Sequence, residues 1–244
     1  MAGICTRRRA LALAAASLAA PRLSWPGDPE RPRIDDYLLA NARGLEILGG
    51  KPPTERDICS ADAILDAAPT SSPFEVALYF ENLKKKNEDG DAFNCRWPVR
   101  ANPVIVAFFT ATTTGDPGTD SVPWCSAFVN WCLQRANKAG TNCAIAQSFL
   151  CYSKPISPAA GQIAVFKGTG SSDSDQDACH ATGGHVAFYL GESGDEIQIL
   201  GGNQCRDGEY CDPNQINRTC VTRMTRPRRN EHQTFHSVRE IVVA

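Results

Sequence analysis

The chain has 244 residues, 42% of them hydrophobic, which is typical of one globular domain or of one domain with a helical extension. A formal net charge of -2 with both signs interspersed provides no basic surface for nucleic acid, so nucleic-acid binding is excluded from the expected functions. The basic stretch RMTRPRR at 223–229 is interpreted as a solvated face.

The first residues combine a cationic start, TRRR at 6–9, with an apolar Ala/Leu run from Ala10 to Ala20. This is the layout of an export signal. The run is much shorter than the roughly 20 residues that a membrane-spanning helix needs. We therefore predict a signal peptide over 1–25, similar to a twin-arginine signal, and an exported protein with no stable membrane anchor. An amphipathic first helix of the mature chain is the alternative.

The chain contains 11 cysteines, a number that suits an oxidising compartment and predicts disulfide bonds, although their connectivity stays open. No CxxC pair is present. A zinc site at Cys179 and His180, or at His232 and His236, is therefore a minority interpretation. We expect neither a metal nor another cofactor.

Residues 26–115 are predicted to form a helical N-terminal region. Ser71 or Ser72 can cap a helix that has Pro73 in its first turn. The other helices expected here are 35–48, 57–67 and one that begins at Pro103.

Residues 116–244 are predicted to form the second unit, after the turn-rich stretch TTTGDPGTDS at 112–121. Helices are expected first, and short strands separated by Gly, Ser and Asp follow. This order favours an α+β domain with a small antiparallel sheet over alternating βαβ units. The expected helices are 123–139 and 144–150, and the expected strands are 161–167, 184–191, 196–202 and 237–244.

The stretch VPWCSAFVNWCL at 122–133 contains two cysteines with different expected roles. Pro123 suits the beginning of a helix, which places Cys125 near free backbone N–H groups. A helix N-terminus beside an imidazole would lower the pKa of the thiol and activate it as a nucleophile. Cys132 lies about two turns deeper and is expected to be a packed thiol or a disulfide partner.

His185 opens the predicted strand HVAFYLG, directly after two glycines, and is the candidate base. The next strand ends in ILGGNQ, so Asn203 or Gln204 offers a side-chain amide that can orient the imidazole. A nucleophile, a base and an orienting group are the three roles of a catalytic triad.

WCSAFVNWCL, GQIAVF, GGHVAFYLG and ILGGNQ, in this order, resemble the CHAP branch of the papain-like cysteine peptidases, related to NlpC-type cell-wall peptidases. The resemblance implies a papain-like CHAP fold over 116–244, with the nucleophile helix packed on an antiparallel sheet. It assigns catalytic roles to Cys125, His185 and Asn203. Substrate-binding or oxyanion roles are expected for Trp124, Ser126 and Gln204.

That family cleaves peptidoglycan, as an amidase or as an endopeptidase. The resemblance therefore implies a thiol hydrolase acting on stem or cross-bridge peptides through a thioester. The predicted signal peptide adds that the enzyme is exported, periplasmic or secreted, and we expect a monomer. Two segments depart from the family pattern: 168–183, expected to be a lid or rim of the cleft, and the cysteine-rich 205–220. The alternatives are a catalytically silent cell-wall-binding module and a disulfide-rich interaction protein in which Cys125 is bridged.

Overall fold

The computed structural model describes residues 51–113, 117, 119–205 and 219–243. The predicted signal peptide at 1–25 and the predicted helix at 35–48 lie outside the described residues.

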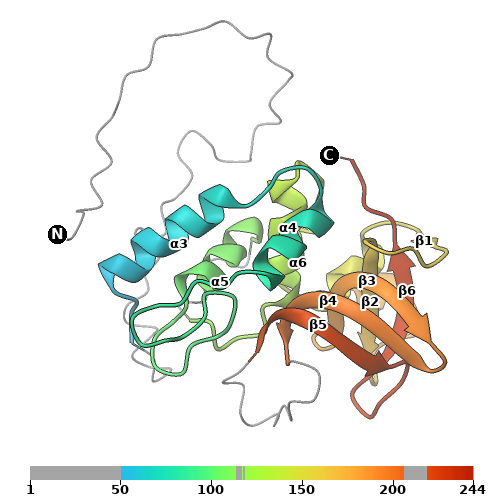
Figure 1. Cartoon of the computed structure of the whole chain (residues 1–244). Helices are drawn as coiled ribbons and strands as arrows, with labels where there is room; N and C mark the ends of the chain where they lie inside the picture. Colours follow the sequence, from blue (N-terminus) through green and yellow to red (C-terminus); the bar gives the residue numbers. More distant parts are fainter. Residues whose placement is uncertain (1–50, 114–116, 118, 206–218, 244) are drawn as a thin grey trace, which may run out of the picture.

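One six-stranded antiparallel sheet forms the C-terminal part of the chain, with strand order β1-β6-β2-β3-β4-β5. All the described helices except the short Asp175–Ala178 precede the sheet in the chain, and the longer helices lie apart from the sheet (Figure 1), so the predicted α+β class is confirmed. The strands are β1 (Pro155–Ile156), β2 (Ile163–Gly168), β3 (His185–Ser193), β4 (Glu196–Gln204), β5 (Cys220–Pro227) and β6 (Gln233–Arg239).

The helices begin where local chemistry favours a helix start. Ser72 caps α4 by accepting a hydrogen bond from the Glu75 backbone N–H, and Pro73 occupies the first turn, as predicted. Asn102 caps the helix that begins at Pro103 in the same way. The α-helices are α3 (Glu55–Ala67), α4 (Pro73–Glu81), α5 (Pro103–Phe108), α6 (Cys125–Arg135) and α7 (Asp175–Ala178), and the 3-10 helices are η1 (Phe109–Ala111) and η2 (Ala146–Cys151).

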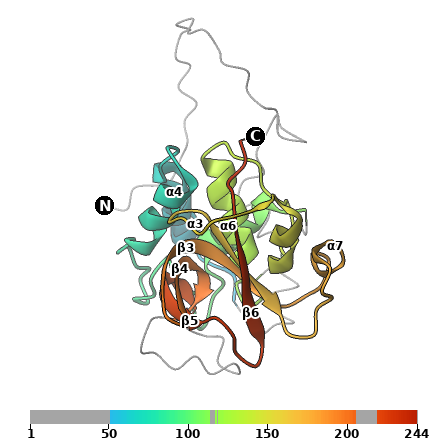
Figure 2. The ribbon, with the colours of Figure 1, turned by 90° about the vertical axis from the view of Figure 1, so that its right-hand side faces the viewer.

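Helix α6 is the centre of the fold. It lies between the other helices and the sheet, with contacts to α4 and α5 on one side and to β3 and β4 on the other (Figures 1 and 2). All residues from Cys125 to Leu133 are buried. One hydrophobic cluster joins α3, α4 and α5 to α6 and to the facing side chains of the sheet, so the described helices before residue 115 share a core with the strands.

The opposite face of the sheet has its own apolar cluster, which we call the outer cluster: Ala164, Phe166, Ala187, Tyr189, Ile197, Ile199 and Val238. Met224 of β5 and Phe235 of β6 pack against it. Because side chains alternate along a strand, His185 of β3 shares this face with Ala187.

Several predicted boundaries are wrong. The helix expected at 123–139 spans only Cys125–Arg135, and the segment expected as a helix at 144–150 is the 3-10 helix η2. The strand expected at 237–244 lies earlier, as β6. The stretch 223–229 is not simply a solvated face, because most of it belongs to strand β5, which pairs with β4.

Two disulfides join described cysteines to one another, in agreement with the prediction of disulfide bonds. Cys95 pairs with Cys220 and thereby joins the loop after α4 to the beginning of β5, and Cys151 pairs with Cys179. Cys132 is a fully buried free thiol, which confirms its expected packed position. In the described ranges we find no helix with the length and apolar character needed to cross a membrane.

Candidate active site

Cys125 is the first residue of α6, and Trp124 occupies the N-cap position without a side-chain cap. The backbone N–H groups of Val186 and Ser126 donate hydrogen bonds to the Cys125 sulfur. The thiol therefore lies against the backbone of Val186, the residue that follows His185 at the start of β3. Only 4% of Cys125 is exposed, so the open helix end expected from the sequence is in fact covered.

His185 begins β3 opposite Phe166 of β2, and it is 4% exposed. Gly184 precedes it with a backbone φ of 70°, and a Cβ at this position would meet the Phe166 carbonyl oxygen at 2.3 Å. Only glycine fits this left-handed, closely packed position. Gly184 thus allows β3 to begin directly at His185.

Gln204, the last residue of β4, holds the imidazole. Its Oε1 lies 3.0 Å from Nε2 of His185, and its Nε2 donates to the Thr222 backbone carbonyl at 2.8 Å. A carbonyl can only accept, so Thr222 fixes which end of the amide faces the imidazole. Gln204 Oε1 must then accept from a protonated Nε2. Nδ1 of His185 is left with its lone pair.

Of the two amides expected to orient the imidazole, Gln204 and not Asn203 contacts His185 in the structure. Asn203 has a backbone φ of 58°, and its Oδ1 is buried with no hydrogen-bond partner among the described residues. The pairing of β4 with β5 shifts register between Gly201 and Gln204. This irregularity rotates the end of the strand, so that Gln204 takes the place beside His185.

Burial keeps both reacting groups neutral in the structure. It raises the pKa of the Cys125 thiol, and this effect outweighs the lowering by the backbone N–H groups around the sulfur and by the Arg226 guanidinium. Burial, together with the smaller effect of the nearby Arg226 guanidinium, lowers the pKa of His185 to about 3. The lowered thiol pKa expected from the helix start is therefore wrong for this closed site, which contains a thiol and a neutral imidazole.

Arg226 is the residue of the site that sequence reasoning missed. It lies on β5 opposite Ile197, and its guanidinium carbon is 5.9 Å from the Phe166 ring centroid. The Phe166 ring is in turn 6.3 Å from the His185 ring. Arg226 also lowers the pKa of the Cys125 thiol. The signal was hidden because Arg226 stands among three other arginines within 223–229.

Trp124 and Ser126 have largely structural positions. Trp124 is fully buried and packs against Phe108 and Phe128 in the core. The Ser126 hydroxyl donates to the Cys143 backbone carbonyl at 2.6 Å and so holds the loop after α6. Ser126 therefore reaches Cys125 through its backbone N–H, whereas its hydroxyl is engaged by the loop.

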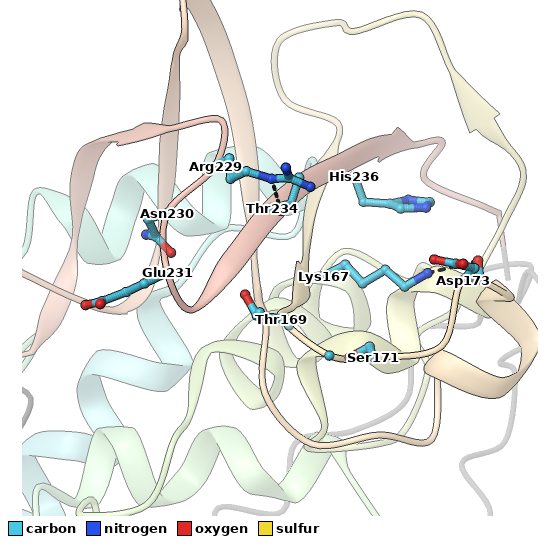
Figure 3. Close-up of a pocket in the computed structure, with 11 residues that line it drawn as sticks. Lys167, Thr169, Ser171, Asp173, Arg229, Asn230, Glu231, Thr234 and His236 are labelled. Carbon is cyan, nitrogen blue, oxygen red and sulfur yellow. Dashed lines mark hydrogen bonds between the residues drawn. The ribbon is translucent and has the colours of Figure 1, made fainter.

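A separate polar pocket of about 600 Å³ lies at the end of β2. Figure 3 shows Lys167, Ser171, Arg229 and His236 around it, whereas Cys125, His185 and Gln204 do not line it. The segment 168–173 forms one wall, so this part of the expected rim borders the pocket.

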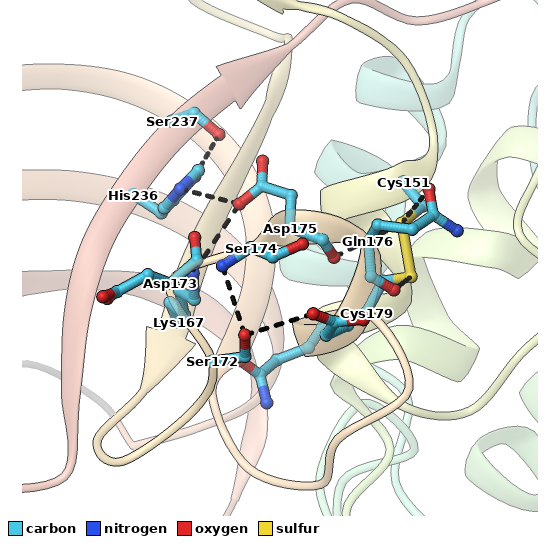
Figure 4. Close-up of polar contacts among 12 residues, drawn as sticks. Cys151, Lys167, Ser172, Asp173, Ser174, Asp175, Gln176, Cys179, His236 and Ser237 are labelled. Atoms are coloured by element: carbon cyan, nitrogen blue, oxygen red, sulfur yellow. Dashed lines mark hydrogen bonds and ion pairs between the residues drawn. A yellow bond between two sulfur atoms is a disulfide. The ribbon is translucent and has the colours of Figure 1, made fainter.

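Asp175 of α7 ties the same segment to the sheet (Figure 4). Its carboxylate lies 2.6 Å from Arg239, 3.0 Å from His236 and 3.7 Å from Lys167. The disulfide between Cys151 and Cys179 closes the other end of α7. These contacts hold the segment 168–183 against the sheet at one end of α7 and against η2 at the other.

Across the described ranges, no cluster of three or more His, Cys, Asp or Glu side chains has the arrangement needed to hold a metal ion. A scan against protein-family models, a search of curated proteins and a search of solved structures each returned no match.

Proposed function

We propose that the chain is an exported cysteine hydrolase with a papain-like arrangement, which cleaves amide or peptide bonds of peptidoglycan. The observation that carries this proposal is the hydrogen bond between Gln204 Oε1 and His185 Nε2 at the start of β3. The backbone of the next residue, Val186, lies against a cysteine at a helix N-terminus. A nucleophile, a base and an orienting amide are then supplied by three separate elements, α6, β3 and β4. The peptidoglycan substrate and the export rest on the sequence resemblance and on the signal-like first residues.

With the proton on Nε2 and a free lone pair on Nδ1, His185 can act as the base in a defined sequence of proton transfers. Nδ1 of His185 takes the proton from the Cys125 thiol while the sulfur attacks the amide carbonyl carbon. The new C–S bond moves the carbonyl electron pair onto oxygen, where backbone N–H groups at the start of α6 stabilise it. Collapse breaks the C–N bond, His185 protonates the leaving amine, and a thioester remains. Water, deprotonated by His185, hydrolyses the thioester and restores the thiol.

The neutral resting pair makes this a general-base mechanism. A preformed thiolate would need a lowered thiol pKa, whereas burial raises the pKa of Cys125 and lowers that of His185. Proton transfer must then accompany the attack on the carbonyl carbon. Gln204 contributes by accepting from Nε2–H as positive charge develops on the ring.

The test is digestion of purified peptidoglycan by the full chain, with mass spectrometry of the products. We expect released peptides from the wild type and none from Cys125→Ala, while Cys143→Ala, which removes a partly exposed free thiol that is not part of the proposed triad, keeps the activity. Free stem peptides would indicate an amidase and shortened stems an endopeptidase. Equal release by wild type and Cys125→Ala would refute the proposal.

A catalytically silent wall-binding module is the second candidate, because Cys125 is nearly inaccessible and its thiol pKa is raised. It predicts co-sedimentation with peptidoglycan but no products, and no preferential alkylation of Cys125 by iodoacetamide at any pH. The third alternative, in which Cys125 is bridged, disagrees with the structure, where Cys125 is a free thiol.

A further inference from the structure

Arg226 holds a half-buried guanidinium on the same side of the sheet as the candidate base. Along β5, Met224 and Arg226 alternate onto the outer-cluster face, where Met224 packs directly. The guanidinium lies over the Phe166 ring, which is also the neighbour of His185. The arginine, the aromatic ring and the imidazole thus form one contiguous group.

The charge of Arg226 has no carboxylate partner among the described residues. Within the described part of the chain, its only hydrogen bond runs from Nε to the Met224 sulfur at 3.3 Å, and a thioether is a weak acceptor. Other arginines of β5 and β6 behave differently: Arg223 pairs with Glu81 at 2.9 Å, and Arg239 pairs with Asp175 at 2.6 Å. A half-buried guanidinium has five donors suited to a planar, bidentate acceptor.

We propose that Arg226 binds a carboxylate of the substrate beside Cys125 and His185, and so selects peptides with a free carboxylate near the scissile amide. The proposal rests on the function proposed above. A carboxylate is favoured because it matches the guanidinium fork and compensates its charge where solvent is limited.

The electrostatics of the site give such a carboxylate a second effect. Arg226 opposes protonation of His185, which is the step that the proposed mechanism requires. A bound carboxylate neutralises the guanidinium and removes this opposition. Substrates with the carboxylate should therefore have a higher kcat as well as a lower KM. A purely structural role of Arg226 would not produce this pattern.

The first experiment needs no knowledge of the natural substrate. Iodoacetate and iodoacetamide alkylate the same sulfur and have nearly the same size, so access and thiol pKa cancel in the ratio of their rates. Rates at Cys125 are followed by peptide mass spectrometry. In wild type we expect the ratio of iodoacetate to iodoacetamide to exceed that of Arg226→Gln about five- to tenfold at low ionic strength.

Arg226→Lys keeps the charge and should retain most of the preference, which separates charge from folding. Cys143, partly exposed, is the internal reference, and its ratio should be equal in all variants. A ratio at Cys125 that stays unchanged in Arg226→Gln would overturn the proposal.

The second experiment compares stem peptides that carry free carboxylates with the same peptides as carboxamides. Wild type should prefer the acids about tenfold in kcat/KM, and Arg226→Gln should cut both forms at similar rates. Cleavage of both forms at equal rates by wild type would overturn the role of Arg226 and leave the hydrolase intact. Absence of cleavage by wild type would overturn the hydrolase, and the alkylation ratio would still decide whether Arg226 attracts a carboxylate.

Discussion

Trp124, which precedes the nucleophile Cys125, packs closely against Gly202 of β4. The position of Cys125 depends on this contact. A Cβ built at Gly202 would meet two Trp124 ring carbons at 2.3 and 2.7 Å and the Phe128 Cβ at 2.9 Å. Relaxed contacts between carbon atoms are about 3.5–4.0 Å. Gly202→Ala must therefore push Trp124, the N-cap residue of α6, away from the sheet by roughly 1 Å or more.

Trp124 is fully buried among Phe108 and Phe128, so it has little room to yield. Overpacking of this kind costs about 1–3 kcal/mol, and the upper end is expected because backbone and aromatic ring are both fixed. For a protein of this size that is a fall in Tm of roughly 6–12 °C. The displacement also moves Cys125, so its alkylation by iodoacetamide should become faster.

The control is Gly191→Ala on β3, where the nearest atom to an added Cβ is the flexible Gln198 side chain at 3.8 Å. Thermal unfolding followed by circular dichroism, together with mass mapping of alkylated Cys125, measures both effects. If Gly202→Ala matched Gly191→Ala in Tm and in thiol reactivity, the packing of Trp124 on β4 would be refuted.

The remaining predictions concern the site and its supports. Gln204→Leu leaves a buried imidazole N–H unpaired and should lower the free energy of unfolding, measured in urea, by about 1–3 kcal/mol. The ¹⁵N chemical shifts of the His185 ring should then no longer indicate the Nε2–H tautomer, and unchanged shifts would contradict the assignment. The pKa of His185 is lowered to about 3, so between pH 6.5 and 3 the unfolded chain binds a proton that the native site does not bind. The free energy of unfolding should therefore fall as pH drops through this range, by at most about 1.4 kcal/mol per pH unit. A His185→Gln variant with the same slope would contradict this. Burial raises the pKa of Asp120 to about 6, so this residue contributes stability below its ordinary pKa that is lost as pH rises through 6, and Asp120→Asn should remove that loss in urea titrations. Replacing Cys95 and Cys220 by serine opens a loop with a sequence separation of 125 and should cost about 2–5 kcal/mol, whereas equal urea midpoints would show that the bridge adds nothing.

Much of the fold follows from local sequence. Ser72 and Pro73 define the start of α4, and the alternation of HVAFYLG defines β3, because capping and side-chain alternation act over a few residues. The sheet order does not follow in this way. Strand β6 lies between β1 and β2 and pairs with both, and this depends on contacts between distant segments that no local pattern contains.

The ionisation of the site could not be predicted either. A helix N-terminus and a neighbouring imidazole argue for a thiolate, and that inference is sound for a solvated site. Burial of Cys125 depends on how β3 and β4 close over the beginning of α6, and the desolvation it causes has the opposite sign. The balance is decided by tertiary structure.

The choice between Asn203 and Gln204 shows how one backbone torsion decides a site residue. In a regular strand, Asn203 would lie on the same face as Gly201. A Cβ built at Gly201 would meet the Ala187 Cβ at 2.7 Å, so this is the face of Ala187. His185 lies on that face too, two residues before Ala187. Strict alternation therefore favours Asn203. The φ of 58° at Asn203 breaks the alternation and brings Gln204 to the imidazole. Asparagine is among the few non-glycine residues that tolerate this torsion, so Asn203 serves the site through its backbone, and the amide that acts on His185 belongs to its neighbour.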